Sequence, residues 1–298
     1  MKSTFSPVSL VTPAGTLYGT LELPSTDNLI PVFLIISGSG PTDRDGNSAM
    51  LPGKNNSLKM LAGALAENGF ASVRYDKRGI GESKDAGLNE QELRFDDFVD
   101  DAVAWVTQLR NDVRFSDVGI IGHSEGSLIG MLATAITNAG AFISLEGAGR
   151  PANEIIQEQL AGQTGSIVAE VNRINAELKA GKTVGDIDPK LYSLFRPGIQ
   201  PYMISWYKYD PAVEIARLTC PVLIVLGTTD IQVKQADAEL LKAAKPDAVY
   251  ALINGMNHVL KDAPVDRVEN LATYSNPDLP LSADLLNALM KFFKNVFR

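Results

Sequence analysis

The stretch that decides the fold is Gly122-His123-Ser124-Glu125-Gly126, which has the pattern G-x-S-x-G. It directly follows the apolar run 118–121 (VGII), and a helix-forming stretch continues over residues 127–137. A strand, a tight turn and a helix in this order are typical of a nucleophile elbow, which lifts a serine hydroxyl clear of a sheet. Because the same pattern also occurs by chance in loops, the rest of the chain must support this interpretation.

The bulk composition is that of an ordinary globular chain with an acidic balance. The 298 residues are 45% hydrophobic and 21% charged, which provides enough apolar material for a large core. The formal net charge is −8, and the isoelectric point is about 4.9. Because phosphate backbones are bound by clustered Lys and Arg, we expect no nucleic-acid partner. We interpret the negative charge as a contribution to solubility.

Cysteine and histidine are scarce, which limits the chemistry that the chain can perform. Cys220 is the single cysteine, so an intrachain disulfide cannot form, and its place in an apolar run favours an inert core thiol. The two histidines are His123 and His258, too few for a cluster of Cys and His ligands around a metal. We therefore expect no metal site.

The sequence shows neither a targeting segment nor a membrane segment. Residues 1–7 lack the apolar core of a signal peptide. No apolar run approaches the roughly 20 residues that a membrane span needs. These observations predict a cytoplasmic protein with no membrane span, and we expect a monomer or a homodimer.

Apolar runs alternate with helical patterns along most of the chain, which predicts the fold class. We expect strands at residues 5–10, 16–23, 31–37, 70–75, 118–121, 142–145, 221–226 and 248–253. We expect helices at residues 57–68, 95–109, 127–137, 233–244 and 282–297. Strands that alternate with helices predict an α/β fold with a mostly parallel sheet and helices on both faces.

The alternation stops between residues 151 and 215, which read as helices and loops without an obvious strand. Because expected strands lie on both sides of this segment, it predicts a helical cap inserted into one core. The core then comprises residues 1–150 and 216–298. Such an insertion lies at the carboxyl ends of the parallel strands, where folds of this type bind their ligands.

A catalytic Ser124 requires a base, because a serine hydroxyl is a poor nucleophile until its proton is taken. His123 is adjacent to Ser124, and neighbouring side chains on a tight turn generally diverge. His258 lies in a loop just after the expected strand 248–253, from which a side chain can reach the elbow. His258 is therefore the predicted base.

Two aspartates are candidates for the carboxylate that fixes the tautomer of the base. Asp230 follows the expected strand 221–226 directly, and it lies between Ser124 and His258 in the chain. Asp210 lies at the end of the predicted cap. We favour Asp230, because its position after a strand and the chain order Ser, Asp, His both suit a catalytic triad on this type of sheet.

Backbone N–H groups near the nucleophile are the candidates for an oxyanion hole, which stabilises the charge of a tetrahedral intermediate. One donor is predicted at Glu125 and the other in the loop 37–41 (SGSGP). Within this loop we choose Ser39, with Gly40 as the alternative. Gly38 and Gly40 are also predicted to line the substrate site, because glycine lets the backbone approach a ligand closely.

Two charged, glycine-rich stretches follow expected strands, at residues 43–47 (DRDGN) and 76–83 (DKRGIGES). Both could line the site, but we interpret them as ion pairs and tight turns that brace the catalytic loops. The first stretch lacks the spacing of an EF-hand calcium loop.

The predicted cap is dense in aromatic and aliphatic side chains. Some of them pack the cap onto the sheet, and others are expected to line an apolar pocket for an acyl or alcohol group. Tyr202 and Trp206 are the residues that we predict to contact substrate.

Taken together, these motifs resemble those of the α/β-hydrolases, and more narrowly those of bacterial carboxylesterase-like hydrolases that are often classed with serine aminopeptidase-like proteins. The narrower resemblance rests on residues 37–46, 122–126, 209–211, 229–233 and 255–258. The resemblance implies an eight-stranded, mostly parallel sheet with a helical cap. It also implies no cofactor and hydrolysis of esters with small to medium acyl chains.

Other functions remain open to a chain with these residues. The same triad can serve an amidase, an aminopeptidase or a thioesterase. An aminopeptidase needs acidic groups to hold a free amine, and Glu125, Glu146 and Glu154 are the candidates. Some proteins with this fold have lost their chemistry and act as binding proteins. Because all three triad positions are filled, we predict a serine carboxylesterase whose partner is a small-molecule ester.

Overall fold

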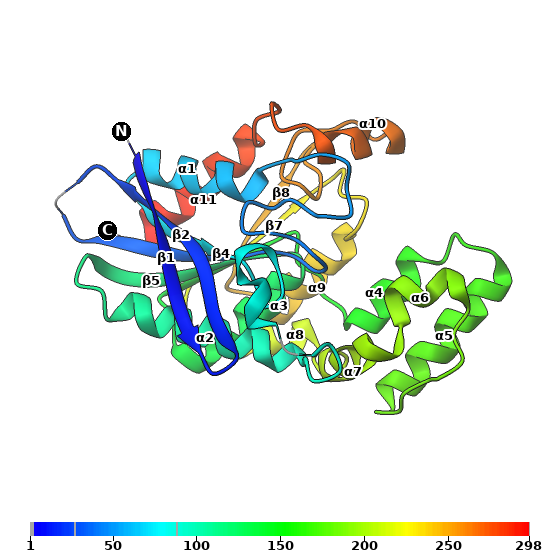
Figure 1. Ribbon diagram of the computed structural model, residues 1–298. Coiled ribbons are helices and arrows are strands. Elements are labelled where there is room, and N and C mark those ends of the chain that lie inside the picture. Colours follow the sequence, from blue (N-terminus) through cyan, green and yellow to red (C-terminus); the bar gives the residue numbers. More distant parts are fainter. Residues whose placement is uncertain (1–2, 27, 88, 298) are drawn as a thin grey trace.

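A computed structural model describes residues 3–26, 28–87 and 89–297, so positions 1–2, 27, 88 and 298 of the predicted core lie outside the described residues. Its centre is an eight-stranded sheet with the order β1-β2-β4-β3-β5-β6-β7-β8 (Figure 1). The strands are β1 (Ser3–Thr12), β2 (Gly15–Pro24), β3 (Ile30–Ile36), β4 (Ala71–Tyr75), β5 (Phe115–His123), β6 (Ala141–Leu145), β7 (Val222–Gly227) and β8 (Val249–Ile253).

Strands β4, β3, β5, β6, β7 and β8 run parallel, and an antiparallel hairpin of β1 and β2 extends one edge of the sheet. β2 joins the parallel strands by pairing antiparallel with β4. The hairpin turns at Gly15, whose φ of 130° is a conformation that glycine adopts without steric cost. The predicted eight-stranded, mostly parallel sheet is confirmed.

Helices cover both faces of the sheet, as predicted. The α-helices are α1 (Ser57–Glu67), α2 (Phe95–Arg110), α3 (Glu125–Thr137), α4 (Ala152–Gln159), α5 (Gly165–Lys179), α6 (Tyr192–Phe195), α7 (Gln200–Trp206), α8 (Pro211–Ala216), α9 (Gln235–Ala244), α10 (Arg267–Ala272) and α11 (Ala283–Val296). The 3₁₀ turns are η1 (Gly81–Ala86), η2 (Pro189–Leu191), η3 (Pro197–Ile199) and η4 (Thr273–Ser275). Helices α1 and α11 lie on one side of the sheet, and α2 and α3 lie on the other (Figure 1).

Strand β3 shows why both faces need a cover. Phe33 and Ile35 belong to the buried cluster that the sheet forms with α1 and α11. Leu34 and Ile36, which alternate with them, belong to the buried cluster formed with α2 and α3. Successive side chains of a strand point to opposite faces, so a continuous apolar run is stable only between two layers of helices.

A helical insertion separates β6 from β7, as the sequence predicts. Helices α4, α5 and α6 project to one side of the sheet (Figure 1). Helix α7 contacts α2, and the rings of Phe95 and Trp206 stack there with centroids 5.8 Å apart. Helix α8 packs against α3 and α9, so the last helix of the segment 151–215 lies in the layer that covers the sheet. The division of the chain at residue 215 stays a prediction.

Two short elements, η1 and α10, do not follow from the sequence pattern. Each has six residues, which is too short to show an apolar stripe of helical period. The start of α10 does carry a local signal, because the side chain of Asp266 accepts hydrogen bonds from the amides of Val268 and Glu269. Aspartate is a preferred residue at this capping position.

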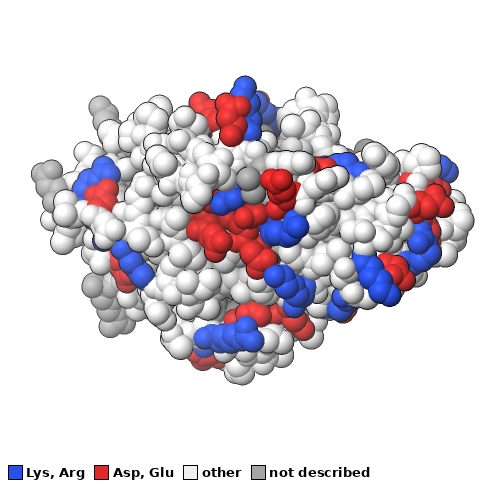
Figure 2. Space-filling model, turned by 60° about the horizontal axis from the view of Figure 1, so that its bottom comes forward, with Lys and Arg blue, Asp and Glu red and all other residues white. Residues whose placement is uncertain are grey.

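The helices and the surface charges of the described residues have two general features. No helix among the described residues is both long and apolar enough to span a membrane. On the face that Figure 2 brings forward, Asp and Glu gather near the middle with Lys and Arg between them. Charges of both signs are thus interspersed on this face, which does not present the continuous basic surface that nucleic acids require.

Candidate active site

Ser124 sits on a strained turn between β5 and α3. Its φ of 55° and ψ of −121° lie in a region that non-glycine residues rarely occupy. A Cβ atom on Gly122 would overlap the carbonyl oxygen of Gly126, and one on Gly126 would overlap that of Ile36. The turn can therefore close only with glycine at these two positions. This geometry is that of the elbow that the G-x-S-x-G pattern predicts.

His258 and Asp230 form a hydrogen-bonded pair at the carboxyl ends of two neighbouring strands. The Nδ1–H group of His258 donates to Oδ2 of Asp230 over 2.7 Å. Oδ1 of Asp230 accepts the backbone amides of Gln232 and Val233. Burial acts to raise the pKa of Asp230, but His258 and the hydrogen bonds outweigh it and lower the pKa to about 2. An ionised Asp230 therefore holds the His258 ring with its Nδ1 atom protonated.

Asp210, the rival carboxylate, has a structural role at the start of α8. Its side chain accepts a hydrogen bond from the amide of Ala212 at 3.0 Å, as expected for an N-cap residue. Asp230, and not Asp210, is the residue that the fold brings to His258.

The loop that carries His258 is tied to the elbow by His123. The Nε2–H group of His123 donates to the backbone carbonyl of His258 over 2.7 Å, and the two rings have centroids 4.9 Å apart. Burial, followed by the proximity of His258, lowers the pKa of His123 to about 3. His123 is therefore neutral, and its Nε2–H group anchors the loop of His258 to the elbow.

Nε2 of His258 is the ring nitrogen that does not face Asp230. It has no hydrogen-bond partner among the described residues, and no hydrogen bond joins it to Oγ of Ser124. Catalytic hydrogen bonds of this kind are often long without substrate and shorten in the reacting complex.

The predicted oxyanion loop passes directly beside Ser124. A Cβ atom on Gly38 would lie 3.1 Å from Cβ of Ser124, so the glycine backbone contacts the elbow. Gly38 is buried, whereas Ser39 and Gly40 are exposed. Gly40 has a φ of 69°, and a Cβ atom there would meet no neighbour within 4 Å. The loop therefore has one residue packed on the elbow and two that face open space.

Glu125 is fixed by two buried partners. Nζ of Lys77 donates to Oε2 of Glu125 over 2.7 Å and to the carbonyl of Gly38 over 2.6 Å. The hydroxyl of Tyr202 donates to the other carboxylate oxygen of Glu125. The residue after the nucleophile is thus bound to the oxyanion loop and to the cap.

Glu146 is a buried acidic residue that sequence reasoning did not place beside the pair of His258 and Asp230. It follows β6 directly, with a φ of 51°, and its side chain is fully buried. Oε1 accepts the backbone amide of Gly227 at 2.9 Å. Burial, and then the charge of Asp230, raises the pKa of Glu146 well above its usual range, and a hydrogen bond between the two carboxyl groups lowers the pKa of Asp230. The raised pKa therefore favours the protonated, neutral form of Glu146 beside Asp230.

The sequence does give a signal for Glu146, because this acidic residue follows an apolar strand. The signal is ambiguous, since Asp230 follows an apolar strand in the same way. One ligand atom each from Glu146, Asp230 and His258 lie within 4.8 Å of one another. His258 is already hydrogen-bonded to Asp230, and Glu146 already accepts the amide of Gly227. These hydrogen bonds use atoms that a metal would need. This cluster is therefore a hydrogen-bonded network in its own right.

The two predicted substrate residues of the cap have different surroundings. Tyr202 is 7% exposed, and its hydroxyl reaches Glu125 beside the nucleophile. Trp206 is partly buried and stacks on Phe95 of α2. Tyr202 is thus close to the predicted centre, and Trp206 contributes to the contact between cap and core.

The loops that follow β3 and β4 are braced as the sequence predicts. Oδ1 of Asp76 accepts the amide of Arg44 at 2.8 Å, and the Arg44 guanidinium pairs with Asp76 and Glu82. Oδ1 of Asp43 accepts the amides of Asp45 and Asn47. These contacts hold the segment after the oxyanion loop against the end of β4.

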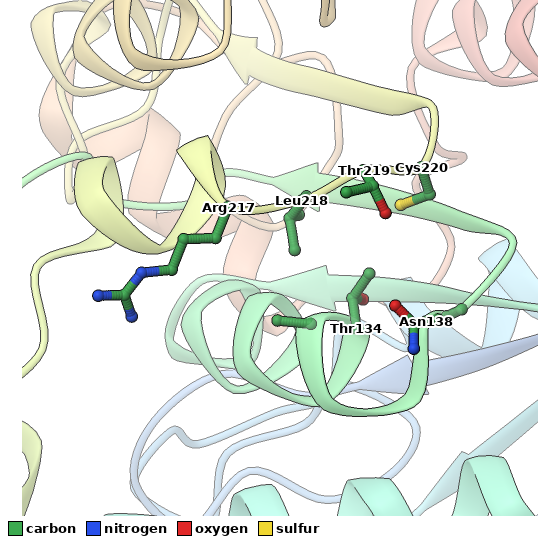
Figure 3. Close-up of a pocket in the computed structure, with 8 residues that line it drawn as sticks. Thr134, Asn138, Arg217, Leu218, Thr219 and Cys220 are labelled. Carbon is green, nitrogen blue, oxygen red and sulfur yellow. The ribbon is translucent and has the colours of Figure 1, made fainter.

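Two pockets are found among the described residues, and the first of them lies beside these loops. A cleft of about 490 Å³ opens between the segment 41–54 and residues 79–81, next to the oxyanion loop. A small second pocket lies where the end of α3 meets residues 217–220, and Cys220 lines it (Figure 3). Cys220 is partly buried at the edge of the core and not inside it as predicted, and burial raises the pKa of its thiol to about 11. The second pocket lies at the start of β7, whereas Asp230 follows its end.

Known proteins resemble this chain over most of its length. Residues 54–168 match the family described as serine aminopeptidase, S33. The chain is 27% identical over 262 residues to Esterase EstD of Thermotoga maritima, and the match covers 84% of this chain. The chain spans 60% of the length of that curated relative.

Solved structures of enzymes share the architecture. Est1E from Butyrivibrio proteoclasticus, determined with ferulic acid, has a TM-score of 0.62 at 20% identity, over 94% of this chain and 95% of that chain. The α/β hydrolase GrgF from Penicillium sp. has a TM-score of 0.61 at 17% identity, over 98% and 99% of the two chains. Together with the strand order and the elbow at Ser124, these similarities show that this chain has the α/β-hydrolase fold.

Proposed function

We propose that this protein is a serine hydrolase that cleaves carboxylic esters with small to medium acyl chains through an acyl-enzyme intermediate. The observation that carries the proposal is the hydrogen-bonded pair of His258 and Asp230, on a loop anchored to the strained elbow of Ser124. The similarity to Esterase EstD supports an ester as the substrate.

In the proposed reaction, Oγ of Ser124 attacks the ester carbonyl while Nε2 of His258 takes its proton. The N–H groups of Glu125 and Ser39 stabilise the tetrahedral oxyanion. His258 then protonates the leaving alcohol, and the acyl group remains on Ser124. A water molecule activated by His258 releases the acid. Asp230 stabilises the imidazolium in both steps, and no cofactor is needed.

The surroundings of the acidic residues favour ester cleavage over aminopeptidase activity. Recognition of a free amine needs an available carboxylate. Glu125 is already paired with Lys77, Glu146 is buried and its pKa is raised by that burial, and Glu154 is exposed on α4. Thioesters suit the same machinery and differ from esters only in the leaving group.

The substrate site is proposed to lie between the oxyanion loop and the cap. Gly38 and Gly40 present backbone to the substrate from one side, and Tyr202 and Trp206 come from the cap. The cleft beside Pro41 and Ile80 provides further space for a group attached to the carbonyl.

The experiment compares Ser124→Ala with Ser166→Ala, an exposed serine on α5. With p-nitrophenyl butyrate, Ser124→Ala should lose on the order of 10⁴-fold or more in kcat, and Ser166→Ala should retain the activity. A fluorophosphonate probe should label the unmodified protein but not Ser124→Ala. Undiminished turnover by Ser124→Ala would refute the assignment of Ser124 as the nucleophile. If the unmodified protein neither turns over esters nor reacts with the probe, the result would favour a binding protein over an enzyme.

A further inference from the structure

We propose that Lys77 is a positioning residue for the oxyanion hole, which it sets by holding the carbonyl of Gly38 and the carboxylate of Glu125 at the same time. The inference rests on the proposed function and assigns a role to a buried charge that the proposed reaction does not otherwise use.

Lys77 is placed between the two segments that carry the predicted oxyanion donors. It follows β4 by two residues and is 2% exposed. Its Nζ atom lies 2.6 Å from the carbonyl oxygen of Gly38 and 2.7 Å from Oε2 of Glu125. The same ammonium lies 5.1 Å from the ring centre of Phe98. Its buried partners are therefore one carbonyl, one carboxylate and one aromatic face.

The bond to Gly38 matters because of the geometry of the peptide unit. The carbonyl of Gly38 and the N–H of Ser39 belong to one planar group, and in a trans peptide they point in opposite directions. The described residues contain no cis peptide. An ammonium that holds the Gly38 oxygen therefore fixes the direction of the Ser39 N–H and, by polarising the peptide, strengthens it as a donor.

The bond to Glu125 acts on the other donor. Glu125 is the first residue of α3 and provides its own N–H to the predicted hole. Because its side chain is held by Lys77 and Tyr202, the residue cannot shift without breaking a buried ion pair. A single ammonium thus links both donors, and Tyr202 extends the link to helix α7 of the cap.

A double variant can separate a purely structural role of the Lys77–Glu125 ion pair from the proposed positioning role. Buried ion pairs contribute little net stability compared with well-packed apolar side chains, whereas removal of one partner alone is strongly destabilising. The double variant Lys77→Met with Glu125→Met therefore removes the charges together and leaves an apolar pair of similar length. It keeps the backbone N–H of residue 125.

The experiment measures kcat and KM for p-nitrophenyl butyrate in the double variant and in Lys77→Gln, with exposed Lys84→Met as the control. We expect kcat to fall about 10²-fold in the folded double variant, as when one oxyanion donor is lost, with KM changed less than about threefold. Affinity for an alkyl trifluoromethyl ketone, which forms an oxyanion adduct with the serine, should fall in parallel. A folded variant of either kind with the kcat of the unmodified protein overturns the proposal.

A measurement on the unmodified protein decides the question if neither variant folds. Binding of the trifluoromethyl ketone should move the amide proton resonances of both Ser39 and Glu125 downfield, and a Ser39 resonance that stays in place overturns the proposal. If the unmodified protein shows no ester turnover at all, the proposed function fails. If it turns over esters and only the Lys77 prediction fails, the proposed function stands.

Discussion

Asp230 and Asp210 both accept hydrogen bonds from nearby backbone amides, but only one of them contacts His258. Asp230 accepts the Nδ1–H of His258, and Asp210 caps α8. Both aspartates bind backbone amides near their own position, which is the ordinary use of Asp in a turn. The difference between them is therefore the partner that the tertiary fold supplies.

The first prediction compares Asp230→Asn with Asp210→Asn. Asn at position 230 can no longer hold the imidazole in the required tautomer or stabilise its charge, so kcat should fall about 10⁴-fold. Asn caps a helix about as well as Asp does, so Asp210→Asn should change kcat by less than about twofold. Initial rates with p-nitrophenyl butyrate check this. A comparable loss in both variants would contradict the assignment of the acid.

Glu146 gives a second prediction at this scale, which concerns pH and stability. Its pKa in the folded protein is raised by burial and by Asp230, so the folded state keeps a proton that the unfolded chain releases above about pH 4.3. Stability due to this group is therefore lost as pH rises from that value towards the folded pKa. Gln does not titrate, so Glu146→Gln should lose less stability between pH 5 and pH 7 than the unmodified protein.

Urea unfolding at pH 5 and pH 7 measures this difference. Glu154→Gln is the control, because Glu154 is exposed on α4 and should leave the pH dependence as it is. Asp230 has a lowered pKa, so its contribution to stability is lost only as pH falls below the measured window of pH 5 to pH 7. The same pH dependence for Glu146→Gln and the unmodified protein would show that Glu146 is ionised.

At the scale of elements, the junction of β5 and α3 depends on close backbone approach. Gly122 and Gly126 face carbonyl groups on Gly126 and Ile36 that leave no room for a Cβ atom. Gly165, at the start of α5, has no neighbour within 4 Å of the corresponding position. These glycines therefore differ in what a methyl group would cost.

We expect Gly122→Ala to destabilise the protein by roughly 1–3 kcal/mol or more, the usual range for inserting a group into a packed site. Gly165→Ala should be neutral or slightly stabilising, because Ala loses less backbone entropy in a helix. Thermal unfolding of both variants measures the difference. An unchanged melting temperature for Gly122→Ala would mean that the turn is more open than the structure shows.

At the scale of the whole molecule, helix α7 of the cap contacts helix α2 of the core. Trp206 stacks on the buried Phe95, the Phe95 amide donates to Oγ of Ser205, and Lys208 pairs with Asp96. These contacts couple the position of the cap to the helix that covers the sheet.

Trp206→Ala should loosen the cap while leaving the sheet intact. We expect a loss of roughly 3 kcal/mol or less, below the value for a fully buried aromatic residue, and faster proteolysis within residues 151–210. Tyr192→Ala is the control, because Tyr192 is 54% exposed on α6. Limited proteolysis followed by mass spectrometry locates the cuts. Equal protection in Trp206→Ala and Tyr192→Ala would show that the stacking contributes nothing to cap docking.

The sequence alone was sufficient for the α/β alternation, for the helical insertion and for the elbow. These features are local: strand and helix patterns repeat over a few residues, and the turn at Ser124 needs glycines at fixed neighbouring positions. The choice of His258 and Asp230 also came from the sequence, because the chain has two histidines and the chain order limits the acids.

Only the tertiary structure decided which buried polar groups meet. Lys77 binds Glu125 from 48 positions away, and Glu146 binds the amide of Gly227 from 81 positions away. Such pairs form because parallel strands bring their carboxyl ends to one edge of the sheet. The hydrophobic pattern of the sequence does not indicate which side chains face each other there. The strands, helices and the tight turn could thus be predicted from neighbouring residues, whereas the electrostatics around Ser124 depend on distances that exist only after folding.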